Sequence, residues 1–201
     1  MDVLFLATLI ATGVFVLNAK QQRERVALLA SYLGNYQIEK LMENLTEGYL
    51  RALGESDTER REQVWSLLRT TELQLSEQFT RFTADFTRVE PLQTRISTLP
   101  LALPYADRWL PSASIDMRQA LAIHAQGIER AVRNEAGLSL RDKAYTLSAE
   151  LFLMQHTCHW FCKSRAIASA RLMARHKTPH AQVLASVTPA TRTAYLALLG
   201  G

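Results

Sequence analysis

The sequence predicts an all-α protein: an N-terminal single transmembrane helix that continues into a cytoplasmic four-helix-bundle-like domain with two short C-terminal helices. Three observations predict this fold class. The 6 prolines and 8 glycines among 201 residues cluster in a few places, and the stretches between them are rich in residues that lose little side-chain freedom in a helix. Apolar residues recur there at steps of three and four, and an uncharged apolar run stands near the N-terminus.

The first element is the run "VLFLATLIATGVFVLNA", residues 3–19, which carries no charge and is followed by "KQQRER". As a helix it would be about 25 Å long, slightly less than the ~30 Å thickness of a hydrocarbon core. We therefore predict that residues 1–19 are a transmembrane anchor and residues 20–201 a helical domain. The alternative is a buried helix of a soluble domain, because a short apolar run does not distinguish the two.

Charge around this run predicts its orientation. A cleavable secretory signal would carry positive charge before the run, where only Asp2 stands. Positive charge follows instead, at Lys20, Arg23 and Arg25, and the positive-inside rule then predicts that these residues flank the cytoplasmic side. We expect a bacterial inner-membrane protein with its C-terminal bulk in the cytoplasm. The excess of Arg over Lys, typical of GC-rich coding, indicates the bacterial source, and two unpaired cysteines fit a reducing compartment.

The next two elements are separated by a glycine. Apolar spacing predicts a helix over 20–53, with Gly34 as a candidate bend. "GESD", residues 54–57, combines a C-terminal glycine with a new N-cap, so a second helix is expected over 57–89. Pro91 ends that helix.

Residues 91–113 form a connection that holds four of the six prolines and cannot be a regular helix. It is also too apolar for a free linker. Either it packs over the bundle, or it touches the membrane interface, where residues such as its Tyr105 and Trp109 are favoured.

Caps define the remaining elements. Ser114 caps a third helix over 114–136, and "SLRD" has the form of a capping box that starts a fourth helix over 139–176. Two Thr-Pro pairs start short helices over 178–187 and 188–199, with proline at the first helical position. Short connections make consecutive helices antiparallel neighbours, which favours a four-helix bundle.

The segment "HTCHWFC", residues 156–162, is the one cluster of candidate metal ligands: His156, His159, Cys158 and Cys162. On a helix the two cysteines face one way and the two histidines the other, so the four do not converge on one ion. The haem-attachment pattern and the Glu-x-x-His pattern of di-iron bundles are missing. We expect these side chains to pack inside the helical bundle and to bind no metal and no cofactor. Metal, haem or thiol-redox chemistry at this segment is the alternative.

The same helix is apolar on both sides from Leu147 to Ile167, so its own chain or a partner must cover both sides. Aromatic residues are enriched in interface cores. Phe152 and Trp160 on this helix, and Tyr105 and Trp109 in the connection, are therefore candidate interface residues.

Charge and motifs limit the function class. The formal net charge is +4, and six basic residues but no carboxylate follow Glu150. These basic residues form no stripe on a helical wheel, so nucleic acid is not an expected partner. Phosphate-binding loops, the nucleophile elbow and H-E-x-x-H are absent from the sequence.

We therefore expect a non-enzymatic adaptor, scaffold or accessory subunit of an inner-membrane assembly, with the membrane and another protein as partners. One alternative is a helical haem, metal or thiol-redox protein that uses residues 156–162. Another is a soluble helical regulator with a basic C-terminal half.

Overall fold

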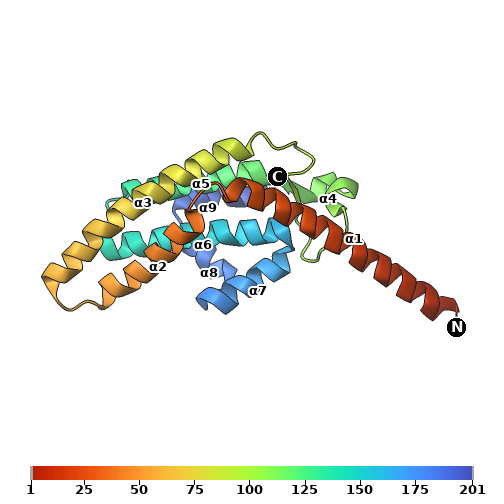
Figure 1. The fold of residues 1–201 in the computed structure, drawn as a ribbon, viewed down its shortest axis with the longest axis horizontal. Helices are drawn as coiled ribbons and strands as arrows, with labels where there is room; N and C mark the ends of the chain where they lie inside the picture. The colour runs from red at the N-terminus through yellow and green to blue at the C-terminus, as the bar shows by residue number, and fades with distance from the viewer. Residues whose placement is uncertain (1, 201) are drawn as a thin grey trace.

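The computed structural model describes residues 2–200, and nine α-helices make up most of this part of the chain. Figure 1 shows an elongated helical body from which the N-terminal half of the first helix projects. The predicted all-α class and the long apolar N-terminal helix are confirmed.

The first helix, α1 (Asp2–Leu33), has two distinct halves. Every side chain from Val3 to Leu17 is exposed, whereas Leu29 near its other end is buried against the body. α1 is long and apolar enough to cross a membrane, and by length and composition it could serve as an anchor or a signal sequence.

The helix predicted over 20–53 is two helices, because the chain breaks at residues 34–37 before α2 (Ile38–Gly54). Contacts with the next helix fix the break. Tyr36 donates its hydroxyl hydrogen to Asp85 at 2.6 Å, and the Gln37 backbone N–H donates to Gln78 Oε1 at 2.7 Å. Ile38 can then turn into the core, where it is 2% exposed.

The helix α3 (Thr58–Phe86) begins where the sequence predicts, because Asp57 accepts a hydrogen bond from the Arg60 backbone N–H at 3.1 Å. α3 ends three residues earlier than expected. The connection after it contains two short strands, β1 (Arg95–Ser97) and β2 (Ser114–Asp116), a four-residue helix α4 (Ala106–Trp109) and a 3₁₀ turn over 111–113.

The two strands pair antiparallel with Ile96 opposite Ile115, and both isoleucines are buried. Residues 114–116, predicted to open a helix, therefore belong to a strand. The helix α5 (Met117–Arg133) starts after them, capped by Asp116, which accepts from the Arg118 backbone N–H at 2.9 Å.

The helix predicted over 139–176 is also two helices, α6 (Leu140–Cys162) and α7 (Arg165–His176). The predicted cap at Ser139 is confirmed, since its hydroxyl accepts from the Asp142 backbone N–H at 3.1 Å. Lys163 leaves helical geometry, and Ser164 recaps the chain by accepting from the Ile167 backbone N–H at 3.3 Å. The chain thus turns after "HTCHWFC" instead of running straight through it.

Two short helices end the chain as predicted, α8 (His180–Ser186) and α9 (Pro189–Gly200). Pro189 occupies the first position of α9, whereas Pro179 precedes α8 by one residue.

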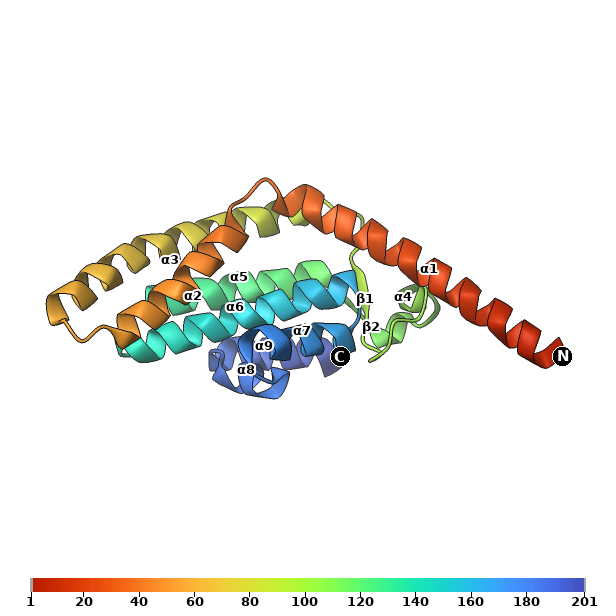
Figure 2. The same cartoon turned by 60° about the horizontal axis from the view of Figure 1, so that its bottom comes forward.

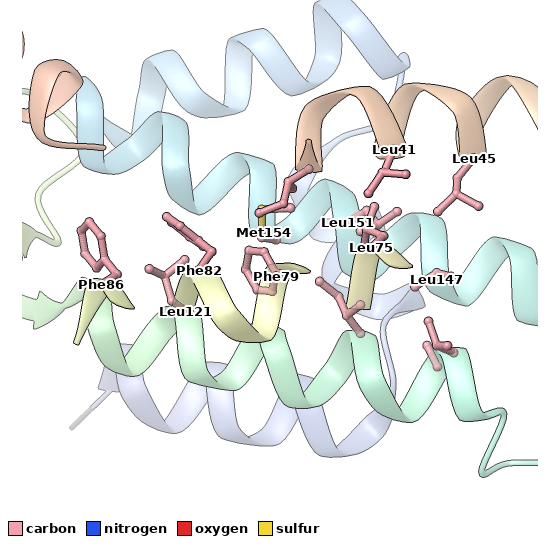
Figure 3. Packing of buried hydrophobic residues seen from close by; sticks show 14 of the residues in the cluster. Leu41, Leu45, Leu75, Phe79, Phe82, Phe86, Leu121, Leu147, Leu151 and Met154 are labelled. Carbon is pink, nitrogen blue, oxygen red and sulfur yellow. The ribbon is translucent and has the colours of Figure 1, made fainter. Parts of the chain in front are cut away.

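The main core lies among α2, α3, α5 and α6, which pack against one another. Figure 3 shows apolar side chains of these four helices meeting in one layer; those labelled are Leu41, Leu45, Leu75, Phe79, Phe82, Phe86, Leu121, Leu147, Leu151 and Met154. The helices α8 and α9 close a second, smaller cluster around Leu153 and Tyr195. In Figure 2 the projecting half of α1 leaves this body beside α4.

Candidate functional site

The point where α1 leaves the body is held by three α1 side chains on one helical face: Asn18, Gln21 and Arg25. We call their contacts with residues 102–107 the α1 junction. Asn18 Nδ2 donates to the Ala102 carbonyl at 2.8 Å. Gln21 accepts from the Tyr105 backbone N–H at 3.0 Å and donates to Asp107 at 3.0 Å. The connection is thereby fixed to the first residues after the apolar run.

Arg25 is the centre of the α1 junction. Its guanidinium pairs with Asp107 at 3.1 Å and donates to the Arg95 carbonyl at 2.7 Å. It also lies over the Phe161 ring, 5.4 Å from the centroid. The Arg25 side chain is only 14% exposed, so its guanidinium contacts the body, while its predicted place beside the membrane stays a prediction. Lys20 and Arg23 remain exposed.

Large apolar side chains are exposed next to the α1 junction. Trp109 is 81% exposed, the highest value for any aromatic residue in the described chain. The three leucines of residues 101–110 are exposed too: Leu101, Leu103 and Leu110. Tyr105 is half-buried, and the exposed Arg108 lies over its ring at 4.8 Å. We use the name junction patch for the exposed residues Leu101, Leu103, Arg108, Trp109 and Leu110.

The four candidate ligands of "HTCHWFC" are not brought together. His156 is 1% exposed, its Nε2 lies 3.1 Å from Ser169 Oγ, and its ring lies 4.2 Å from that of His180. Burial lowers the pKa of His156 to about 3. His159 is half-buried, and burial together with Arg171 and Arg175 lowers its pKa. Within residues 2–200, no three His, Cys, Asp or Glu side chains are placed to hold a metal ion.

The two cysteines line a groove of about 480 Å³ between α1, α2 and α6. His159 lines the same groove, whereas His156 does not. Both are free thiols, and Cys158 Sγ lies 3.9 Å from Met154 Sδ. Burial raises the pKa of Cys162 to about 11 and raises that of Cys158 further. Both remain protonated at neutral pH, which makes them poor nucleophiles.

The candidate interface residues differ in exposure. Trp160 is 1% exposed and donates its indole N–H to the Ser97 carbonyl at 3.0 Å, so it belongs to the core and not to an exposed interface. Phe152 is half-buried and stacks on His176 with ring centroids 3.7 Å apart. Trp109 is the aromatic candidate that remains open to solvent.

Sequence reasoning missed two buried polar groups. In the first, Glu72 accepts from the Tyr49 hydroxyl at 2.6 Å and forms an ion pair with Lys143, which links α2, α3 and α6. The sequence does indicate that Glu72 is buried, since it stands four residues after Leu68, inside the apolar stripe of α3.

The second group joins α5, α6 and α9. Glu150 is fully buried and accepts from the backbone N–H and the hydroxyl of Thr188, each at 2.9 Å. Burial raises its pKa. Nearby, His124 Nε2 lies 2.9 Å from Thr157 Oγ1, which in turn lies 3.3 Å from the Tyr195 hydroxyl. These bonds join the three helices inside the core, and they leave Glu150 Oε2 and His124 Nδ1 buried without a hydrogen-bond partner.

Gly127 permits this approach, because a Cβ atom there would lie 2.4 Å from Glu150 Oε2 and 2.3 Å from Thr191 Oγ1. Both distances are far below a van der Waals contact. A glycine on α5 is thus required for close packing against α6 and α9.

Comparison with known proteins adds no further constraint: no family model, no curated protein and no solved structure matches this chain.

Proposed function

We propose that this chain is a single-pass, membrane-anchored helical adaptor or accessory subunit of a bacterial inner-membrane assembly, with its helical body in the cytoplasm. The observation that carries the proposal is the exposure of every side chain from Val3 to Leu17 on a helix that continues into the core. In water this surface would be strongly unfavourable, whereas a hydrocarbon core would cover it.

Charge supports the orientation. Lys20 and Arg23 are exposed directly after the apolar half of α1, and basic residues near a span favour the cytoplasmic side. Arg25 adds little to this rule because Asp107 neutralises it.

A non-catalytic role is supported by how the ionisable groups of the body are used. Glu72, Lys143, Glu150 and His124 contact one another or neighbouring helices inside the core. Such bonds stabilise one packing arrangement and leave these side chains unavailable to a substrate. A rigid body that presents apolar surface at the membrane is suited to holding other components together.

Fractionation of the full chain with a C-terminal tag tests the proposal. We expect the protein in the membrane pellet, resistant to alkaline carbonate, with an unprocessed N-terminus by intact mass. The tag should resist protease in spheroplasts and become sensitive after lysis. The matched control lacks residues 2–17 and should leave the pellet.

A soluble full chain, or a mass showing removal of the apolar segment, would overturn the anchor. An absorption spectrum and metal analysis of the same purified sample test the alternative use of residues 156–162, because bound haem or stoichiometric metal would contradict the adaptor proposal.

A further inference from the structure

We propose that the junction patch is a second membrane contact, which inserts Trp109 and its neighbouring leucines into the lipid headgroup layer. This inference rests on the proposed anchoring by α1, and it adds a specific surface of the body to that anchor.

The position of the α1 junction is the first step. Asn18 directly follows Leu17, where the fully exposed stretch of α1 ends, and its side chain is hydrogen-bonded to the Ala102 carbonyl. The flanking residues Leu101 and Leu103 are therefore held where the apolar surface of α1 ends. Figures 1 and 2 both show α4 beside α1, at the end of the body from which the helix projects.

Helix length is the second step. Residues 3–17 span only about 22 Å at the rise of an α-helix, whereas a hydrocarbon core is ~30 Å thick. A span that is too short thins the bilayer locally and draws its flanking residues toward the lipid. Because the α1 junction joins the connection to Asn18, the junction patch is drawn in with it.

The chemistry of the patch is the third step. Trp109 is 81% exposed and Leu101 68%, and an indole ring is favoured at the headgroup level of a bilayer. The exposed basic side chains nearby, Lys20, Arg23 and Arg108, can pair with lipid phosphates. The one carboxylate of residues 101–110, Asp107, is 3% exposed and paired with Arg25, so it does not repel an anionic surface. The exposed Glu24 is the nearby acidic side chain left free.

Tryptophan fluorescence of the full chain, reconstituted in phosphatidylethanolamine and phosphatidylglycerol vesicles with and without brominated acyl chains, tests the proposal. The chain has three tryptophans, Trp65, Trp109 and Trp160. The difference between the wild type and Trp109→Phe reports Trp109 alone. We expect this component to be blue-shifted and mostly lost in brominated vesicles. The remaining emission should be largely preserved, because Trp160 is buried and Trp65 lies near the start of α3, far from α4 (Figure 2).

Flotation and carbonate extraction of the same vesicles separate the two proposals. Protein that floats and resists extraction, but whose Trp109 emission is unquenched and typical of water, would overturn the membrane contact while the anchor stands. A protein partner would then be the remaining occupant. Protein that does not float would overturn both. Trp109→Phe leaves the fold intact, since Trp109 is among the most exposed residues of the body.

Discussion

At the scale of single residues, the interior of the body contains ionisable side chains whose environment changes their chemistry. His124 is fully buried, and only its Nε2 has a hydrogen-bond partner. Burial lowers its pKa from 6.5 to about 3, because the imidazolium would be surrounded by apolar groups. The folded protein therefore keeps this histidine neutral at a pH where the unfolded chain protonates it.

This difference predicts a pH-dependent stability. Between pH 7 and pH 5 the unfolded state binds a proton at His124 and the folded state does not, so stability falls as pH falls through 6.5. The contribution over that interval is about 2 kcal/mol. We expect His124→Gln, which keeps a donor near the Nε2 position, to lose about 2 kcal/mol less than the wild type over the same interval. Urea unfolding at pH 7 and pH 5 measures the free energy of unfolding of both proteins. An equal fall in this free energy in the wild type and in His124→Gln would contradict the expectation.

At the scale of elements, the buried ion pair of Glu72 with Lys143 joins α3 to α6, and Tyr49 brings in α2. Removal of one partner leaves a buried charge without compensation. We expect Lys143→Met to lower the free energy of unfolding by about 3 kcal/mol.

The double variant Glu72→Gln/Lys143→Met should recover most of that loss, because a neutral amide can still accept from the Tyr49 hydroxyl. The matched control is Arg81→Met, since the pair of Arg81 with Glu77 is solvent-exposed and contributes at most about 0.5 kcal/mol. Denaturant unfolding followed by circular dichroism measures all three. A double variant as unstable as the single one would show that the ion pair is not the cause.

Caps could be predicted from the sequence because they depend on neighbours in the chain. Asp57 and Ser139 each accept from a backbone N–H three residues later, and both helices start where these residues predict. The breaks at residues 34–37 and 163–164 could not be predicted in the same way. The Gln37 N–H is satisfied by Gln78, and the Ala166 N–H by the carbonyl of Pro100, both far away in sequence.

In the candidate site, too, features set by neighbours in the chain could be predicted, and features set by distant residues could not. The exposed apolar half of α1 and the aromatic content of residues 91–113 are local properties and were visible in the sequence. The contacts of Arg25 could not be predicted from the sequence, because its partner Asp107 is 82 residues away and its other contacts come from β1 and the end of α6. A basic residue after an apolar run looks the same whether it faces lipid phosphates or a carboxylate of its own chain.

At the scale of the whole molecule, the structure separates into a body and a projecting apolar helix. Residues Val3 to Leu17 are exposed throughout, and Asn18 is the first residue of α1 whose side chain forms a hydrogen bond with the body. We therefore expect deletion of residues 2–17 to leave the thermal unfolding midpoint of the body unchanged within about 2 °C, because few interactions are lost.

The comparison uses the full chain in detergent and the truncated chain in the same detergent. A large fall in the midpoint after truncation would mean that the apolar half packs on the body in solution, which contradicts its assignment as a free surface. Arg25→Met serves as the positive control, since it removes the buried partner of Asp107 and should lower the midpoint in either chain length.

The continuity of α1 has a mechanical consequence. It is one helix of 32 residues without proline, and its one glycine, Gly13, lies in the apolar half. Between Asn18 and Leu33 there is neither a proline nor a glycine at which the helix would bend. Because Asn18, Gln21 and Arg25 fasten this stretch to the body, we expect residues 18–33 of α1 to move with the body as one rigid unit, so that a change in the tilt of this stretch would rotate the body with it.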